Sequence, residues 1–426
     1  MSTVIGQEYT FRISGKKAPT RTLKSAMTER LCTFDQENLD ERGKPTPEYI
    51  KLYEEWGKGK IGVIVLGNLP VSRTDLEAKK NAIIDARSPW DAVEAFKPVI
   101  AAAKAHGSLV IGQATHGGRQ VSEDVNKNPV SSSDVQSPPL GGMTFAKPRP
   151  LTVAEIDDLV KAWGHAADVL YKAGADGIQL HSAHGYLLSQ FLSGRVNRRT
   201  DAYGGSLENR YRIIKRIIEE IRTRVPDEKF MLSIKINSAD FSDGGLTTDE
   251  SRQVCQWLDA AGLDLIELSG GTYESLAFEH KKESTKKREA FFIEFAEALK
   301  PVIQRATICV TGGFRSKAAM EQAISEGSTD LVGLARPLCS EPYLIRDIVE
   351  GKSEGAKENK SPSPVSTATA IYEIGCIATG KPLPDMTDDK VAQEVVAIAT
   401  GQKRPEDKPV EDQNVEASYH KNEGKL

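Results

Sequence analysis

The sequence contains few cysteines, and none of them lies close to another. No Cys-x-x-Cys pair occurs, which argues against a disulfide scaffold, a zinc site or an iron–sulfur cluster. Free thiols in this pattern indicate a reducing compartment, and we expect a cytoplasmic protein. The cysteines are Cys32, Cys255, Cys309, Cys339 and Cys376.

The sequence also lacks long apolar runs and an excess of charge of one sign. No run approaches the roughly 20 apolar residues of a membrane-spanning helix, and the first residues lack the apolar core of a signal peptide. The net charge is −4, and 56 basic residues are interspersed with 60 acidic ones. We therefore expect neither a nucleic acid nor a membrane as a partner. The final Gly-Lys425-Leu426 differs from a peroxisomal address in its Gly, and we interpret it as coincidence.

Short apolar runs alternate along the chain with longer amphipathic segments. The chain has 426 residues, of which 39% are hydrophobic, enough to form a full core. Eight such runs, each followed by helix-like sequence, predict an α/β fold, namely a (β/α)8 TIM barrel. The predicted strands are Leu23–Met27, Ile61–Gly67, Leu109–Ala114, Gly177–His181, Met231–Asn237, Leu263–Ser269, Ala306–Thr311 and Asp330–Ala335.

Helix signals stand between these runs. Ser88 before Pro89, Thr152 with Glu155 three residues later, and Ser206 before Leu207 are capping patterns. The predicted helices are Thr46–Trp56, Pro89–His106, Thr152–Ala173, Leu207–Val225, Thr247–Ala261, Arg288–Ile303 and Ser316–Glu326.

The domain organisation follows from a change in composition near residue 350. We assign residues 1–350 to the barrel and 351–426 to a polar C-terminal extension, with one helix at Thr367–Ala378 and disorder over Gly401–Leu426. Several strand-to-helix loops are long, which in a compact domain indicates lids or binding segments. These loops are Gly117–Pro150, Ser182–Ser206 and Gly270–Lys287.

The richest segment in chemistry is His181-Ser-Ala-His184-Gly-Tyr186, which follows a predicted buried strand. Two imidazoles and a phenol therefore lie where the strand gives way to a loop, at the end of a barrel that carries chemistry. The imidazoles can donate hydrogen bonds to a substrate oxygen, and the phenol can supply a proton. These residues suit an enzyme that polarises a conjugated acceptor and then protonates it. No Asp, Glu or Cys stands at metal-ligand spacing beside them, so a metal site is not expected.

The last two strands predict a phosphate site. Gly312 and Gly313 follow the seventh strand, and Gly333 and Arg336 belong to the turn after the eighth. Glycines let backbone N–H groups approach an anion, and an arginine can bind phosphate oxygens with two N–H groups. The alternative is that these glycines only form tight turns.

Three further strand ends carry polar side chains. Gln113 offers a donor and an acceptor for an imide edge, and Thr28 follows the first strand. Lys235 can stabilise an anionic ring, form the Schiff base of an aldolase, or reach a loop carboxylate. His116 lies near the same end, and we expect its role to be structural.

The long segment from His181 to Arg210 closely resembles the signature of the old yellow enzyme family of FMN-dependent ene-reductases. It reads HSAHGYLLSQFLSGRVNRRTDAYGGSLENR. The resemblance extends from about Thr10 to Pro342 and includes Ala26-Met-Thr28, Gly67, Gln113, the segment from Lys235 to Asp240 and both glycine turns. It implies a single-domain form without the iron–sulfur domain of some relatives.

The resemblance implies a role for each candidate residue. FMN would lie on the barrel mouth with its phosphate at Gly312, Gly313 and Arg336, and the turn that contains Gly333 matches the same end. Gln113 would bind the pyrimidine edge of the flavin and Thr28 its O4 side, with Gly67 and Lys235 completing the cofactor site. His181 and His184 would hold the substrate oxygen, and Tyr186 would deliver the proton.

Two residues depart from the family pattern. Lys235 stands where an arginine is usual, which keeps the charge near the flavin but loses the forked hydrogen bond. Thr28 stands where the branch with a His–His pair usually has Cys, so the chain combines features of two branches.

The implied activity is a ping-pong reduction, by NADPH or NADH through FMN, of the C=C bond of α,β-unsaturated carbonyl or nitro compounds. The partner is therefore a small-molecule substrate, and a homodimer is possible. Two other functions stay open. One is a Schiff-base lyase of the TIM-barrel aldolase type using Lys235, and the other is a flavin-binding barrel without turnover.

Overall fold

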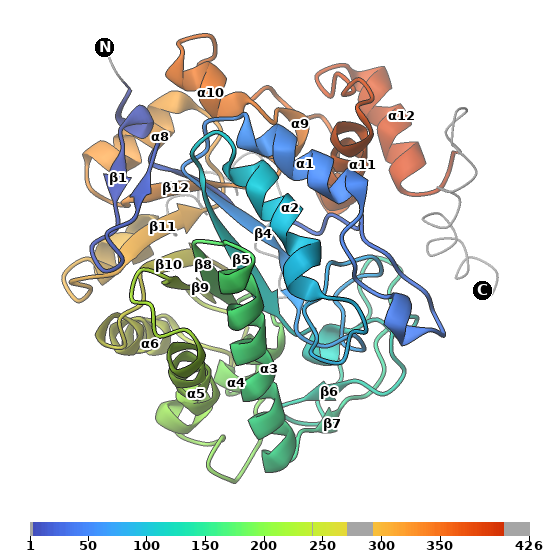
Figure 1. The fold of residues 1–426 in the computed structure, drawn as a ribbon, viewed down its shortest axis with the longest axis vertical. Coiled ribbons are helices and arrows are strands. Elements are labelled where there is room, and N and C mark those ends of the chain that lie inside the picture. The colour runs from blue at the N-terminus through green and yellow to red at the C-terminus, as the bar shows by residue number, and fades with distance from the viewer. Residues whose placement is uncertain (1–2, 241, 271–292, 404–426) are drawn as a thin grey trace.

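The protein forms a closed barrel of eight parallel strands with helices around it (Figure 1). The structure is a computed structural model that describes residues 3–240, 242–270 and 293–403. The predicted TIM barrel is confirmed, and each predicted strand overlaps an observed one. In chain order the strands are β3 (Thr22–Lys24), β4 (Val63–Pro70), β5 (Leu109–Thr115), β8 (Gly177–Ser182), β9 (Met231–Asn237), β10 (Leu265–Ser269), β11 (Thr307–Thr311) and β12 (Leu331–Leu334).

Helices follow the strands and cover the outside of the barrel. Thr152 and Glu155 form the predicted capping box at the start of α3, and Ser206 caps α5. Residues 293–299 are also helical. The helices of the barrel are α1 (Pro47–Gly57), α2 (Ala92–Lys104), α3 (Val153–Lys172), α4 (Leu187–Leu192), α5 (Leu207–Arg224), α6 (Thr248–Ala260), α8 (Lys317–Ser325), α9 (Pro337–Ser340) and α10 (Leu344–Val349).

The barrel interior is apolar near the amino-terminal ends of the strands and polar near their carboxyl ends. Because side chains alternate along a strand, the inward positions two residues apart stack into layers. The next inward positions after the apolar residues carry Ser25, Gly67, Gln113 and Glu267, and Lys235 lies four residues after Met231 on the same face of its strand. Strand register thus delivers most candidate site residues to one end. The apolar layers consist of Leu23, Val63, Val65, Leu109, Ile111, Met231, Leu265, Cys309 and Leu331.

A short hairpin covers the amino-terminal end of the barrel. Its strands are β1 (Tyr9–Thr10) and β2 (Lys17–Ala18), which pair antiparallel. Phe11 and Ala18 belong to the same apolar cluster as the barrel interior. The Ser14 backbone N–H donates to Asp264 Oδ1 at 2.8 Å, next to the start of β10. This end is closed, so chemistry is left to the opposite end.

Several sequence-based assignments were wrong, including the end of the first strand, which lies at Lys24 rather than Met27. Helix α2 begins at Ala92 with Asp91 as its cap, rather than at Pro89 with Ser88. Strand β4 continues beyond Gly67 to Pro70, and its pairing with β5 resumes at Leu69 after an irregularity that begins at Leu66. Helix α4 occupies part of the segment expected to be a loop.

Two predicted features lie mostly outside the described residues. These are the loop Gly270–Lys287 and the disorder over Gly401–Leu426. The long loop after β5 contains a small two-stranded sheet of β6 (Val130–Ser131) and β7 (Arg149–Pro150). Among the described residues, no helix has the length and apolar character that crossing a membrane requires.

The C-terminal segment packs differently in its two helices. Helix α11 (Ser366–Thr379) matches the predicted helix, and its Ala370, Ile374 and Ile377 belong to the main hydrophobic cluster of the barrel. Helix α12 (Asp389–Ala399), which the sequence analysis missed, contributes to a separate small cluster that contains Val395. Figure 1 shows α11 beside α1 and α12 farther out.

This packing yields a stability prediction for the C-terminal segment. Ile374→Ala should lower the free energy of unfolding of the barrel by about 2–5 kcal/mol, because Ile374 is fully buried in the main cluster. Urea unfolding followed by tryptophan fluorescence measures this, since Trp56 and Trp163 are buried in the same cluster. The control Val395→Ala should leave that transition in place. Equal effects of both variants would contradict the division into two clusters.

Candidate active site at the carboxyl end of the barrel

The predicted catalytic residues His181, His184 and Tyr186 lie together at the end of β8. The ring of His181 meets that of His184 edge-on, with centroids 5.3 Å apart, and meets that of Tyr186 at 4.7 Å. His181 and Tyr186 are buried, whereas His184 is half-buried. The structure therefore brings the two imidazoles and the phenol into one contact group.

Local backbone geometry holds His184 in this group. Its φ is +61°, a left-handed conformation that non-glycine residues adopt infrequently, and Gly185 follows with a φ of +80°. The His184 backbone N–H donates to Asn237 Oδ1 at 3.1 Å, and its Nε2 lies 2.8 Å from Ser269 Oγ. Contacts with the ends of β9 and β10 thus orient the second imidazole.

Burial keeps both imidazoles neutral. It lowers the pKa of His184 to about 3, with the nearby charge of Lys235 acting in the same direction. Burial also lowers the pKa of His181 well below its usual value, assisted by His184 and Lys235. The Ala183 backbone N–H donates to His181 Nδ1 at 3.4 Å, so the proton of this neutral ring is on Nε2. A neutral imidazole in this state donates a hydrogen bond without adding charge.

Lys235 and Gln113 belong to one buried polar network inside the barrel. Lys235 Nζ donates to Ser25 Oγ at 2.7 Å and lies 3.2 Å from Glu267 Oε1. Gln113 Nε2 donates to Gln179 Oε1 at 2.7 Å, and Gln179 Nε2 donates to Glu267 Oε2 at 2.9 Å. Within the described part of the chain, Gln113 Oε1 has no hydrogen-bond partner. Gln113 thus retains an acceptor and a second N–H for an imide edge such as that of FMN.

Thr28 lies beyond the end of β3, and Gly67 lies within β4, the neighbouring strand. Thr28 Oγ1 donates to Glu77 Oε2 at 2.8 Å, so its oxygen can still accept a hydrogen bond. Gly67 has a φ of +100°, and a Cβ there would lie 2.7 Å from the Leu69 backbone N. The Met27 backbone N–H donates to the Gly67 carbonyl at 2.9 Å, which fixes the two segments to each other.

Of the predicted phosphate residues, Gly312 and Gly313 follow β11 and Arg336 follows β12. The prediction that Gly333 belongs to the turn after the eighth strand was wrong, because Gly333 lies within β12 and pairs with Thr311. Gly312 and Gly313 have φ values of +142° and +85°, which favour glycine and leave the backbone accessible to an anion. At Gly333 a Cβ would lie 1.8 Å from Thr311 Oγ1, so this position admits only hydrogen. Arg336 Nη1 donates to Ser366 Oγ at the start of α11. These turns and the guanidinium fit a phosphate group.

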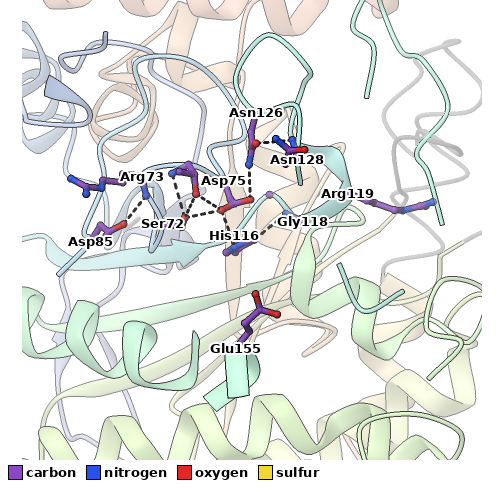
Figure 2. Close-up of polar contacts among 12 residues, drawn as sticks. Ser72, Arg73, Asp75, Asp85, His116, Gly118, Arg119, Asn126, Asn128 and Glu155 are labelled. Carbon is purple, nitrogen blue, oxygen red and sulfur yellow. Dashed lines mark hydrogen bonds and ion pairs between the residues drawn. The ribbon is translucent and has the colours of Figure 1, made fainter. Parts of the chain in front are cut away.

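His116 forms a separate polar cluster beneath the loops (Figure 2). Its Nδ1 accepts the Gly118 backbone N–H at 3.1 Å, and its Nε2 lies 3.6 Å from Asp75 Oδ2. Ser72 donates to the same Asp75 oxygen at 2.8 Å. Burial lowers the pKa of His116, although Asp75 opposes the shift. The His116 carbonyl accepts the N–H of Leu187, directly after Tyr186, so the cluster supports the catalytic turn.

Sequence reasoning missed Glu267 and Gln179, which connect the candidate cofactor residues. Both are fully buried. The available signal was their position on inward-facing steps of the strands, two residues after Leu265 and Gly177. Following the alternation of inward and outward residues along all eight predicted strands would have placed Glu267 and Gln179 in the barrel interior. In the described ranges, no cluster of three or more His, Cys, Asp or Glu side chains could hold a metal ion.

Comparison with known proteins identifies the family. The profile of the NADH:flavin oxidoreductase / NADH oxidase family matches residues 20–354. The NADH-dependent flavin oxidoreductase nadA of Aspergillus parasiticus is 41% identical over 360 residues, which cover 83% of this chain and 80% of that protein. The cinnamate reductase of Clostridium sporogenes is 31% identical over 342 residues, 76% of this chain and 49% of that protein.

The fold has a counterpart among solved structures. An old yellow enzyme homologue from Zymomonas mobilis superposes with a TM-score of 0.69 and 21% sequence identity, covering 85% of this chain and 98% of that one. This likeness shows that the two chains share a fold. The family model and the sequence matches show that the chain belongs to the NADH:flavin oxidoreductase / NADH oxidase family and is an oxidoreductase with FMN as its cofactor and NAD(P)H as its electron donor.

Proposed function

We propose that the enzyme reduces the C=C bond of α,β-unsaturated carbonyl or nitro compounds. The observation that carries this proposal is the contact group of two neutral imidazoles and a phenol at the barrel mouth. Bound FMN supplies the exchange of hydride between NAD(P)H and the alkene. The relative named cinnamate reductase supports an alkene with an adjacent carboxyl-type oxygen as the acceptor class.

The two histidines bind and polarise the acceptor. His181 Nε2–H donates to the substrate oxygen, and His184, oriented by Ser269, provides the second contact. Because both rings stay neutral, they polarise the substrate oxygen through hydrogen bonds alone. Neither ring is an imidazolium that could transfer its extra proton to the substrate. This polarisation makes the β-carbon of the substrate electrophilic.

Tyr186 protonates the α-carbon of the substrate. It is the residue before α4, and its ring packs against His181 with a centroid distance of 4.7 Å, so the phenol is held beside the oxygen-binding group. General acid catalysis of this kind typically contributes about 10²–10⁴-fold to the rate.

The residues that would hold FMN form two groups. The ring would be held by the first group, which consists of Gln113, Thr28, Gly67 and Lys235 on or after neighbouring strands. The phosphate would be held by a second group that consists of Gly312, Gly313, Gly333 and Arg336.

The geometry gives the Schiff-base alternative little support. Lys235 forms an ion pair with Glu267, which requires the ammonium form, whereas Schiff-base formation requires the neutral amine. A flavin-binding barrel without turnover is disfavoured by the assembled His181, His184 and Tyr186. We retain a cytoplasmic location, as well as a homodimer, as proposals.

The proposed activity has a direct spectroscopic test. The purified protein should be yellow, NADH or NADPH should bleach it in the absence of oxygen, and cyclohexenone should then restore the colour. A protein that bleaches but does not respond to the enone or to a nitroalkene would contradict the proposed substrate class. A protein that binds no FMN would contradict the flavin chemistry as a whole.

The role of Tyr186 predicts an unequal effect on the two half-reactions. Tyr186→Phe should leave reduction by NAD(P)H nearly unchanged and should slow reoxidation by enones by about 10²-fold or more, because the proton source is lost. Stopped-flow absorbance measures each half-reaction separately. Equal slowing of both would rule out proton donation by Tyr186.

The neutral histidines predict a loss of stability at low pH. The pKa of His184 is about 3 in the folded protein, against an ordinary value near 6.5, so its contribution is complete above about pH 6.5 and is lost as the pH falls toward 3. At pH 5 this contribution should have fallen by about 2 kcal/mol.

Comparison with His184→Gln isolates this effect from other titrating groups. The difference in unfolding free energy between wild type and variant, from urea unfolding at pH 7.5 and pH 5.0, should change by that amount. A difference that does not depend on pH would show that His184 is not held neutral.

A further inference from the structure

We propose that Glu267 is the positioning residue of the cofactor site: it orients Gln113 through Gln179 and compensates the charge of Lys235. This inference rests on the proposed roles of Gln113 and Lys235 toward FMN. Glu267 lies on β10 and would act on the ring only through these two side chains.

The Glu267 carboxylate contacts three strands of the barrel besides its own, and the residue that follows a fourth. Its Oε1 accepts from Ser25 Oγ and from Thr311 Oγ1, each at 2.7 Å, and lies 3.2 Å from Lys235 Nζ. Its Oε2 accepts from Gln179 Nε2 at 2.9 Å. Ser25 follows β3 and Thr311 ends β11, and Gly312 and Gly313 come directly after Thr311. One side chain therefore contacts the segments that lead to the ring site and to the phosphate site.

The carboxylate determines which way the two amides point. An ionised carboxylate only accepts hydrogen bonds, so Gln179 must turn its Nε2 toward Glu267 and its Oε1 toward Gln113. Gln113 must then turn its Nε2 toward Gln179, as the distance of 2.7 Å records. The oxygen of Gln113 and its second N–H therefore point away from Gln179, and their positions are fixed. The pattern of donors and acceptors offered to an imide edge is set from inside the barrel.

The same carboxylate compensates the charge of Lys235. Burial raises the pKa of Glu267, but Lys235 and the three hydrogen bonds outweigh it, so the net pKa is lowered and the carboxylate stays ionised. Lys235 and Glu267 together carry no net charge. A negative charge that develops on a bound ring is therefore attracted less strongly than it would be by an uncompensated ammonium.

A purely structural role explains this network less well. The lower layers of the barrel are apolar, and replacing a buried ion pair by apolar residues of similar volume is often neutral or stabilising. The polar atoms occur where the strands approach the mouth. The proposed role explains their arrangement, because they fix the hydrogen-bonding groups of Gln113 and the charge of Lys235 at the barrel mouth.

The test compares Glu267→Gln with Asp264→Asn. Asp264 is also a buried carboxylate on the β10 side of the barrel, but it binds Ser14 and Leu232 N–H groups at the opposite end. Glu267→Gln should make the midpoint potential of bound FMN more positive, so that reduced FMN binds about tenfold more tightly relative to oxidised FMN than in wild type. Asp264→Asn should retain the wild-type potential. An unchanged potential in Glu267→Gln would overturn charge compensation.

A second variant tests the orientation of the amides without changing any charge. Gln179→Met should keep the Lys235–Glu267 pair and raise the Kd of oxidised FMN about tenfold, because Gln113 loses its fixed orientation. Fluorescence titration of the apoprotein measures this Kd. An unchanged Kd would overturn the relay, and this variant decides the matter if Glu267→Gln does not fold.

The outcomes separate this inference from the proposed function. If the wild-type protein binds no FMN, or if bound FMN is not reduced by NAD(P)H, the proposed function fails. If wild type is reduced and reoxidised normally while both variants keep its potential and Kd, only the role of Glu267 fails.

Discussion

The structure depends on the alternation of side chains in a closed parallel barrel. Because β3 pairs with β12 and no strand edge is left open, every second residue must point inward, and its height is fixed by register. The inward positions near the amino-terminal ends of the strands are apolar and form the core of the barrel. The inward positions near the carboxyl ends bring Lys235 next to Glu267. They also place Gln179 within hydrogen-bonding distance of both Gln113 and Glu267. Strand register alone therefore places these polar side chains in contact, without any contribution from the loops.

The catalytic turn adds a second constraint, which is desolvation. His181 is buried and His184 half-buried between the strand ends and α4, and the ammonium of Lys235 lies close enough to oppose their protonation. The same ammonium is balanced by Glu267. One charge pair therefore affects both His181 and His184 and the proposed cofactor residues. The His116–Asp75 cluster supports this turn from the other side, through the hydrogen bond between the His116 carbonyl and Leu187.

The sequence predicted the architecture because the signals were local. Apolar runs located all eight strands, and the capping box at Thr152 located α3. The start of α2 was misplaced because Pro89 imitates a first helical residue, while Asp91 makes the capping contact. The His181–Tyr186 group was readable because its members are close in sequence. Glu267 was not, since its partners Ser25 and Gln179 are 242 and 88 residues away and only closure of the barrel brings them together.

The contact between Arg336 and Ser366 has a consequence for synthesis of the chain. β3 cannot complete its pairing until β12 has left the ribosome, and Arg336 cannot make its hydrogen bond to Ser366 until the start of α11 has followed. The barrel therefore spends most of its translation with an unpaired strand edge, a state prone to association with other chains. If Arg336 binds the cofactor phosphate as proposed, loading of the cofactor would follow the emergence of α11 rather than guide the assembly of the first strands.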